Sequence, residues 1–393
     1  MNGISVAGFL AVKEVWRNRG RFLLFGLVIA LITVLVLFIA ALAEGLANAN
    51  REYLSKLDAQ LVVLGDKSDN LIAASRLGRS RMAAVSRVEG VAAAGAIGFA
   101  NAVVAEPLPN DASAPPLRIS LVGVEPGKPG EPRALAGRQL STSQATEAIL
   151  DRGVLLRLNL SVGDTLVLQS TQGTRDEFFS VRVVGVTDAQ QYLFQPTVFV
   201  PMFTWDRIRP KGEGEFANSE LTVNAVAVKV QNPAEAEAMK ARLVGEVGNI
   251  EVLTIREAYE NLPGYSAQQS TLNTQSFFTL LIGVLVIGGF FQIQVLQKVP
   301  QIGVLKAIGA SNLMVGAAAI LQIVLVTAFG VSLGGGLTLL LTLGLPATIP
   351  FAFTGSAVVL AIAALLIIGP LGGSVSIRYS VRIEPLKALG LAS

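Results

Sequence analysis

Charged side chains are distributed very unevenly along this chain, and that distribution limits the folds it can adopt. No ionisable residue occurs between Lys306 and Arg378, whereas residues 44–260 carry charges throughout. Charged residues make up only 15% of the 393 positions, against about 25% in a typical soluble domain. A chain with this pattern meets two solvents, lipid and water. We therefore expect an integral membrane protein with one large aqueous domain.

Four apolar runs are each near or above the roughly 18–20 residues that a helix needs to cross a bilayer. The predicted spans are residues 22–43, 271–296, 313–341 and 351–372. The first run is longer than the apolar part of a cleaved signal peptide, about 7–15 residues, which favours a retained span. Its helical pattern continues outward as a stalk to about residue 57.

Lysine and arginine in the short flanks and loops orient the predicted spans. They precede the first span, separate the second from the third and follow the fourth, while the loop between the third and fourth has no charge. All basic flanks therefore fall on one side, the cytoplasm. We expect a multi-pass plasma-membrane protein with both termini inside: an amphipathic helix in residues 1–21 and a tail in residues 373–393.

The segment between the first two spans, residues 58–266, changes from helical to alternating patterns. Six short runs of alternating branched residues, bounded by Gly, Asp or Asn, are typical of strands. They are Gln60–Gly65, Arg118–Val124, Gly163–Gln169, Phe178–Val186, Thr222–Val230 and Glu251–Thr254. Ser75–Val88 and Ala234–Glu246 have helical character. We expect an α-helical membrane protein with four transmembrane helices and an α+β extracytoplasmic domain between helices 1 and 2.

Several residue types and motifs are missing from the sequence, and their absence excludes whole classes of function. The chain has no histidine and no cysteine, which removes the commonest general base, the commonest metal ligand and any disulfide. It has no phosphate-binding loop of the form G-x-x-x-x-G-K-[ST], and no basic stripe interleaved with aromatic residues. We expect no intrinsic cofactor, no nucleic-acid partner and no enzymatic activity of its own.

The segment after the second span carries the most specific motif. Residues 302–311 read IGVLKAIGAS, and residues 381–389 read VRIEPLKAL. Together with the outer strings GDTLVL and VRVVGV, they resemble the FtsX/MacB-like permeases of ABC transporters. The resemblance implies a MacB-like periplasmic core domain and a cytoplasmic coupling helix at residues 297–312. The coupling residues it implies are Ile302, Gly303, Leu305, Lys306, Ala307 and Gly309.

The physical pattern of this loop allows two interpretations. Ile302, Leu305, Ile308 and Gly309 recur at helical spacing, so a short helix has an apolar face to bury. It can bury that face in the headgroup region of the bilayer or in a partner subunit. The resemblance favours the partner: a separate ABC ATPase that binds ATP and magnesium, with the permease itself forming a homodimer.

The outer end of the first span points to a branch of this family. Residues 37–46 read LFIAALAEGL and resemble the HrtB/DevC-like permeases. The resemblance implies export of haem, as in HrtB-like permeases, or of glycolipid, as in DevC-like ones. An alternative is an FtsX-like signalling module that transmits ATPase motion to a protein partner outside the cell and carries no cargo.

Haem is flat and apolar with anionic propionates, so its site needs apolar walls and basic or amide groups. Residues of these types cluster in sequence near the outer ends of the first two spans and in one basic segment. The predicted cargo residues are Phe38, Glu44, Asn48, Arg76, Arg79, Tyr265, Gln268, Asn273 and Phe277. Without histidine, any ligation of haem iron falls to Glu44, Tyr265 or Met82. Each residue also has a simpler interpretation as helix packing or as solvated surface.

Overall fold

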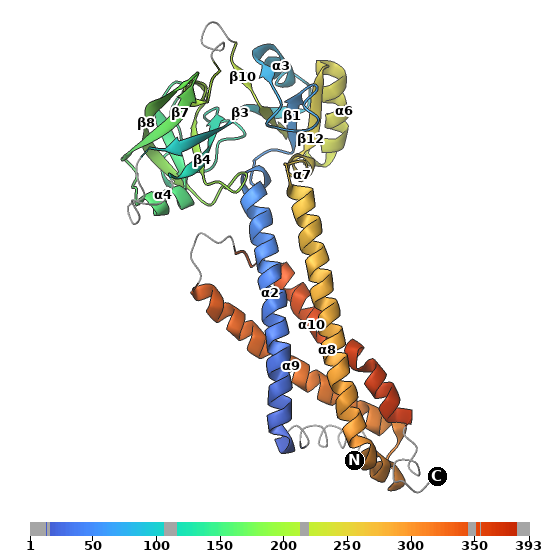
Figure 1. Ribbon diagram of the computed structural model, residues 1–393. Coiled ribbons are helices and arrows are strands. Elements are labelled where there is room, and N and C mark those ends of the chain that lie inside the picture. The colour runs from blue at the N-terminus through green and yellow to red at the C-terminus, as the bar shows by residue number, and fades with distance from the viewer. Residues whose placement is uncertain are drawn as a thin grey trace. The chain divides into compact units, whose positions relative to one another are not determined.

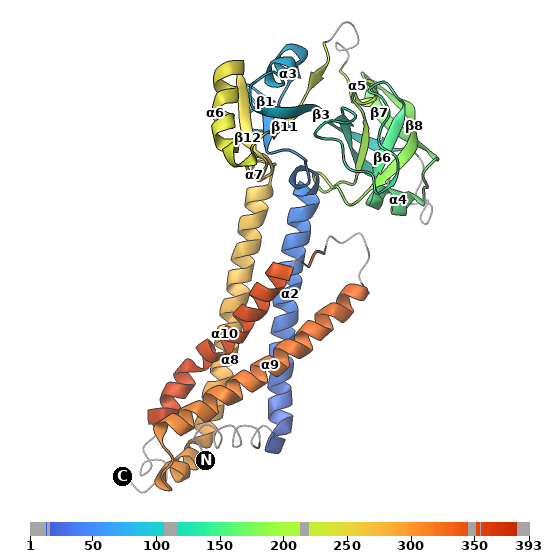
Figure 2. The same cartoon turned by 180° about the vertical axis from the view of Figure 1, so that it is seen from behind.

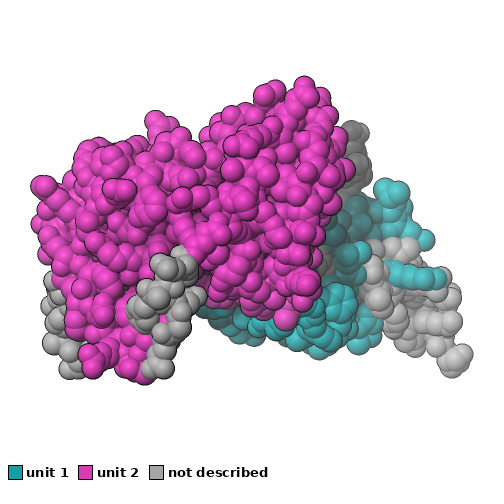
Figure 3. Space-filling view, turned by 90° about the horizontal axis from the view of Figure 1, so that it is seen from above, with its two compact units in different colours: residues 1–45, 269–393 teal, residues 46–268 magenta. Residues whose placement is uncertain are grey.

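The computed structural model describes residues 13, 16–105, 116–212, 220–344, 351–353 and 355–382. The chain divides into two compact units, coloured separately in Figure 3. The helix unit comprises Met1–Gly45 and Gln269–Ser393, and the outer unit comprises Leu46–Gln268. The division interrupts two long helices, each of which starts in one unit and ends in the other. Of the predicted amphipathic helix at residues 1–21, only residues 13 and 16–21 are described, and the predicted tail at residues 373–393 is described only as far as Arg382, where α10 ends.

Four long helices account for the apolar segments of the chain (Figures 1 and 2). They are α2 (Arg19–Ser55), α8 (Tyr265–Ala307), α9 (Asn312–Leu343) and α10 (Gly355–Arg382). Among the described residues, α2, α8 and α9 are long and apolar enough to cross a membrane, whereas α10 contains a shorter apolar stretch, Val358–Gly373. A fourth span therefore remains a prediction. Helix α2 continues without a break to Ser55, close to residue 57, where the helical pattern of the sequence ends.

Small residues let α9 approach α2 closely in the helix unit. A Cβ atom on Gly330 would lie 2.6 Å from the side chain of Ile29, and one on Gly334 would lie 2.5 Å from the carbonyl oxygen of Ala30. Any larger residue would push these two helices apart, which is the usual role of glycine between membrane helices. Around this contact, Phe22, Ile29 and residues of the other helices form an apolar core.

The outer unit is built on one ten-stranded sheet in the order β12-β1-β11-β3-β4-β9-β6-β8-β5, with β7 paired to β3 and β8. Its strands are β1 (Leu61–Gly65), β3 (Val91–Val104), β4 (Arg118–Val124), β5 (Ala136–Gly137), β6 (Glu147–Asp151), β7 (Thr165–Gln172), β8 (Arg175–Thr187), β9 (Thr197–Pro201), β11 (Ala225–Val230) and β12 (Ile250–Thr254). A separate pair joins β2 (Leu77–Gly78) to β10 (Thr222–Val223). The shorter helices are α3 (Arg79–Val85), α4 (Arg152–Leu158), α5 (Met202–Ile208), the 3₁₀ helix η1 (Pro233–Glu235), α6 (Ala236–Val247) and α7 (Ile255–Glu260).

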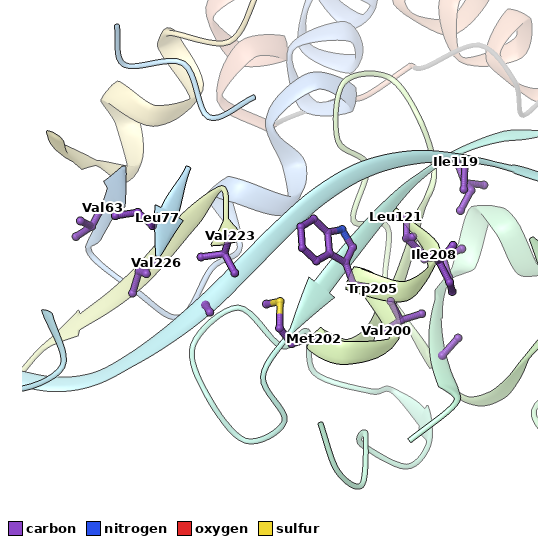
Figure 4. Packing of buried hydrophobic residues seen from close by; sticks show 14 of the residues in the cluster. Val63, Leu77, Ile119, Leu121, Val200, Met202, Trp205, Ile208, Val223 and Val226 are labelled. Atoms are coloured by element: carbon purple, nitrogen blue, oxygen red, sulfur yellow. The ribbon is translucent and has the colours of Figure 1, made fainter. Parts of the chain in front are cut away.

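Both faces of the sheet are buried along β1, β4, β6, β9 and β11, which explains why these strands are almost continuously apolar. In β1, Leu61 and Val63 belong to one core while Val62 and Leu64 belong to the other, as the two-residue period of a strand requires. Figure 4 shows the first core, where Trp205 of α5 packs among side chains from β4, β9 and neighbouring strands. We call the core that contains Leu61 and Val63 the first core, and the core that contains Val62 and Leu64 the second core.

The strand predictions for the outer unit are confirmed at all six runs, with the fifth divided into β10 and β11. The predicted helix at Ser75–Val88 is wrong in its first turn, because Leu77 and Gly78 pair with β10 and only Arg79–Val85 is helical. The longest strand, β3, carries six alanines and two glycines and no clear alternation. Such residues have low strand propensity, so its pairing with three other strands, and not its local sequence, fixes its conformation.

A buried carboxylate, Asp151, fixes the loop that follows β8. It is fully buried as the N-cap of α4, and its two oxygens accept hydrogen bonds from the backbone N–H groups of Gly153 and Gln190. Burial raises the pKa of the Asp151 carboxyl, although these hydrogen bonds oppose the rise. The loop from Gln190 to Gln195 is thereby tied to the sheet.

We predict that Asp151→Asn lowers the free energy of unfolding by about 1–3 kcal/mol, because an amide offers one oxygen where two N–H donors need acceptors. The pKa of Asp151 is higher in the folded state than in the unfolded chain, so the wild type loses stability as pH rises from about 3.9 through the folded-state pKa. The difference in the free energy of unfolding between the wild type and Asp151→Asn should therefore narrow over this pH range. Thermal unfolding of the full chain in detergent at several pH values measures both effects. Asp58→Asn, at a 73%-exposed side chain paired with Lys229, is the control and should change stability by less than about 1 kcal/mol. Equal losses in both variants would contradict the prediction.

Candidate functional site

The outer turns of α2 are built into the second core of the outer unit. Tyr53 and Leu54 are each 1% exposed there. The Tyr53 hydroxyl donates to the carbonyl oxygen of Gly130 at 2.9 Å, and its backbone N–H donates to Gln191 at 3.1 Å. The backbone N–H groups of Leu193 and Phe194 donate in turn to the carbonyls of Asn50 and Ala49. The same loop that Asp151 fixes therefore holds this helix end.

Next to these outer turns of α2, four side chains of α2, α7 and α8 form a cluster that we call the Arg51 cluster: Asn48, Arg51, Tyr259 and Tyr265. Arg51 donates to the Tyr265 hydroxyl at 3.0 Å and to Asn48 at 3.5 Å. Its guanidinium carbon lies 5.2 Å from the centre of the Tyr259 ring, which meets the Tyr265 ring edge-on at 5.7 Å. A cation, an amide and two aromatic rings are thus gathered in one place. These groups suit an apolar ring system that carries a carboxylate.

The structure brings together only part of the predicted cargo set. Asn48 and Tyr265 meet in the Arg51 cluster, and Tyr259 is a member that the sequence prediction missed. Helical spacing could not identify Tyr259, because α7 ends at Glu260 and a turn separates it from Tyr265 at the start of α8. Gln268 lies in the first turns of α8, where its backbone N–H donates to Gly264.

The remaining predicted residues on the long helices belong to the helix unit. The rings of Phe38 and Phe351 form a T-shaped contact with 4.9 Å between their centres, so part of the Phe38 ring is used for packing. Asn273 accepts a hydrogen bond from Gln269 at 3.2 Å, and Glu44 is partly exposed on α2. Phe277 is 62% exposed and contacts Phe278 at 5.6 Å between ring centres. Phe277 therefore presents an apolar surface that the described part of the chain leaves uncovered.

The predicted basic segment does not join the Arg51 cluster. Arg76 donates to the carbonyls of Ala73 and Ser75 in its own loop, and Arg81 pairs with Asp66 at 3.1 Å. Arg79 and Met82 lie on α3, which is remote from the outer turns of α2 (Figures 1 and 2), and line a separate cavity of about 280 Å³. Arg76 and Arg79 of the predicted cargo set therefore lie outside the Arg51 cluster, on a loop and on α3 in another part of the outer unit.

No cluster of three or more acidic side chains that would hold a metal ion occurs among the described residues. Glu44, Tyr265 and Met82, the predicted alternatives for haem iron, lie on α2, α8 and α3 and are not gathered into one ligand set by the described contacts. Of the three, only Tyr265 lies in the Arg51 cluster, and its oxygen already accepts from Arg51.

The loop motif at residues 302–311 forms the tip of a helical hairpin, not a separate short helix. Helix α8 runs without interruption to Ala307, with Pro300 inside it. Gly309 then adopts φ +103°, and the N–H groups of Gly309 and Ala310 donate to the carbonyls of Lys306 and Leu305. This pattern is a Schellman helix ending, which favours glycine. The side chain of Ser311 caps α9 by accepting from the N–H of Met314 at 3.2 Å.

The predicted coupling residues are divided between two surfaces of this hairpin tip. Ile302 and Gly303 are buried within the helix unit, whereas Leu305 is 39% exposed, and Ala307 and Gly309 are exposed. Ile308 and Leu313, which flank the turn, are 80% and 77% exposed. The expected single apolar face through Ile302 and Ile308 is not formed, because Ile302 is 9% exposed whereas Ile308, in the turn after α8, is 80% exposed.

Apolar helices of membrane-crossing length joined to an extracytoplasmic α+β domain define a membrane protein of the permease type. Residues 22–245 match the MacB-like periplasmic core domain, and residues 273–385 match the FtsX-like permease C-terminal family. The chain therefore belongs to the FtsX/MacB-like permease family of ABC transporters. Permeases of this family are not themselves the nucleotide-hydrolysing subunit, and membership implies a partner ATPase.

Relatives with similar sequences extend over nearly the whole chain. One is a Staphylococcus haemolyticus protein assigned as the hemin transport system permease HrtB, 26% identical over 97% of this chain and 99% of its own length. A Staphylococcus epidermidis protein with the same assignment is 22% identical over the same shares. Among solved structures, the extracellular domain of the ABC-type transporter YknZ from Gram-positive bacteria is 14% identical, covering 49% of this chain and 99% of that one, with a TM-score of 0.34.

We predict that Arg51→Gln and Tyr265→Phe are coupled in a double-mutant cycle by about 1.5 kcal/mol, the lower end of the range for a hydrogen bond to a charged group. Thermal unfolding of the full chain and its three variants supplies the free energies. The matched control pairs Arg51→Gln with Tyr259→Phe, which keeps the ring beneath the guanidinium and should show much weaker coupling. Additive losses for Arg51 and Tyr265 would mean that their contact contributes nothing.

Proposed function

We propose that this chain is the permease subunit of an ABC efflux pump that exports haem, or a similar amphipathic anion, from the outer leaflet of the plasma membrane. A separate ATPase drives it, and two permease copies work together. The proposed topology has four spans, with both termini in the cytoplasm and the outer unit outside. The observation that supports haem among the possible cargoes is the sequence similarity to staphylococcal proteins assigned to hemin transport, which extends over nearly the full length of both chains.

The chemistry of the Arg51 cluster supports an amphipathic anion. A propionate needs a hydrogen-bonding cation, and a porphyrin needs aromatic or aliphatic contact. Arg51 with Asn48 supplies the first, and the rings of Tyr259 and Tyr265 supply the second. In this proposal the cargo binds at the Arg51 cluster, on the outer turns of α2 and the first turn of α8.

Iron ligation in this proposal is weak or absent. Without histidine or cysteine the sequence offers Glu44 and the Tyr265 hydroxyl on these two helices. Weak ligation suits an exporter, because a cargo that is released must not be held by strong axial bonds. Arg76 and Arg79 lie on other elements and have no part in this site.

The hairpin tip supports docking of an ATPase. Ile308 and Leu313 present apolar side chains where the sequence also places Lys306, and the helix-stop and helix-start signals of Gly309 and Ser311 give the tip a defined shape. A defined apolar projection fits a groove on a partner subunit. Helix α8 then connects this tip with the end that carries Tyr265.

We predict that the purified permease–ATPase complex binds haemin with a shift of the Soret band and that haemin stimulates its ATP hydrolysis. Arg51→Gln should weaken haemin binding about tenfold or more, since it removes a charged hydrogen-bond donor. Arg87→Gln, the same charge change at an exposed turn after α3, is the control and should bind as the wild type does.

The outcomes separate the cargo from the class of protein. No spectral shift and no stimulation would refute haem as cargo, while the family assignment would stand and a glycolipid or a signalling role without cargo would replace it. Binding that is equal in Arg51→Gln and the wild type would keep haem as cargo and refute the Arg51 cluster as its site.

We predict that Ile308→Ser reduces ATPase co-purification and cargo-stimulated hydrolysis by about tenfold. Burial of an isoleucine side chain contributes roughly 1.5–3 kcal/mol, which corresponds to one to two decades of affinity. The control is Leu343→Ser at the other end of α9, where the leucine is 84% exposed. Normal complex formation by Ile308→Ser, or an equal loss in Leu343→Ser, would contradict docking through the tip.

A further inference from the structure

A cavity of about 470 Å³ lies within the helix unit near the hairpin tip, and no step of the proposed export uses it. It is lined by the inner half of α8, the first turns of α9, and Lys13, Arg17 and Asn18. Among the described residues that line it, three are cationic and none is acidic; the cations are Lys13, Arg17 and Lys298. Its wall therefore attracts anions. Apolar side chains, among them Phe291, Ile302 and Ile323, complete it.

A buried amide on this wall lacks a hydrogen-bond partner. Gln322 of α9 is only 7% exposed. Its Oε1 accepts from Nζ of Lys298 at 3.3 Å, while its Nε2 has no partner within the part of the chain that the structure describes. An unsatisfied buried N–H is unfavourable and rare in folded proteins. An acceptor oxygen from a bound molecule would satisfy it.

The two observations define the chemistry of a group that fits this cavity. An anionic oxygen can accept from Nε2 of Gln322 and interact with Lys298, which lies next to it and also sits 5.7 Å from the ring centre of Phe22. The apolar remainder of the cavity suits a hydrocarbon or ring system attached to that oxyanion. Basic pockets between membrane helices on the cytoplasmic side are suited to anionic lipid headgroups.

We propose that this cavity binds the oxyanion of an amphipathic molecule at the cytoplasmic leaflet, held by Lys298 and Gln322. A phosphate on a membrane lipid and a carboxylate on an amphipathic cargo share this chemistry. The inference depends on the membrane orientation proposed above but not on the identity of the exported cargo. Because Ile302 and Leu305 of the hairpin tip also line the cavity, its occupant contacts the segment assigned to ATPase docking.

The test uses the full permease with its ATPase in nanodiscs of phosphatidylcholine, with and without phosphatidylglycerol. Native mass spectrometry measures the phosphatidylglycerol retained by the wild type, Lys298→Gln, Gln322→Leu and Arg378→Gln. We expect selective retention by the wild type, a loss of about tenfold in Lys298→Gln and a smaller loss in Gln322→Leu. Arg378→Gln removes an exposed cation of α10 that does not line the cavity and should retain lipid normally.

Thermal unfolding keeps the test valid if a variant is unstable. In phosphatidylcholine alone, Gln322→Leu should be at least as stable as the wild type, because it removes the unsatisfied amide. Phosphatidylglycerol should raise the unfolding temperature of the wild type and not that of Gln322→Leu. A Gln322→Leu variant that is less stable in phosphatidylcholine and still responds fully to phosphatidylglycerol would overturn the proposal.

A second arm distinguishes the two sources of the oxyanion. Haemin is titrated into discs that lack phosphatidylglycerol and into discs that contain it. If haemin does not displace the retained lipid, the cavity is assigned to a lipid phosphate. If haemin binding is lost in Lys298→Gln but kept in Arg51→Gln, the cavity is assigned to a carboxylate cargo. If Lys298→Gln and Gln322→Leu bind both molecules as the wild type does, the proposal is wrong whatever haemin does to ATP hydrolysis.

Discussion

The packing of Tyr53 and Leu54 in the second core is the interaction on which the rest of the structure depends. A single helix, α2, is apolar enough to lie in lipid over much of its length and yet ends as part of the core of a water-exposed sheet. Hydrogen bonds from the loop at Gln190–Gln195 fix its last turns, and Asp151 fixes that loop. Helix α8 enters the same core through Tyr265. The outer unit therefore holds both helices by side chains and backbone, and not only through the covalent chain.

The hairpin tip illustrates how a short sequence can encode a complete reversal of direction. Gly309 ends α8 because it tolerates a positive φ, and Ser311 begins α9 because its hydroxyl accepts from a free backbone N–H. Between them, the turn leaves Ile308 and Leu313 with little to cover them in the described part of the chain. The string GAS in the family motif is thus a requirement of backbone geometry, and the exposed apolar residues beside it are what a partner subunit can recognise.

Features that depend on local sequence were predictable, and features that depend on tertiary contacts were not. The apolar helices and the six strand runs follow from hydrophobic periodicity, which a single chain segment displays. The strand β3, rich in alanine and glycine, shows no such period, because its partners determine its conformation. The Arg51 cluster was half predicted: Asn48 and Tyr265 lie at helix ends that could be located, whereas Tyr259 is placed by a turn. The arginines near α3 looked similar in sequence, but their strand and helix carry them elsewhere.

Helix α8 is one continuous element of 43 residues, about 65 Å long at the usual rise. An uninterrupted rod acts as a lever, so a tilt of a few degrees at one end displaces the other by several ångströms. Pro300 is the single proline in this rod and lies near the tip, where it removes one hydrogen bond of the helix ladder. The most flexible point of α8 therefore lies near the hairpin tip, where the ATPase docks in the proposed complex, and the long remainder up to Tyr265 is stiff. In that proposed mechanism, a tilt imposed at the tip passes along α8 with little bending.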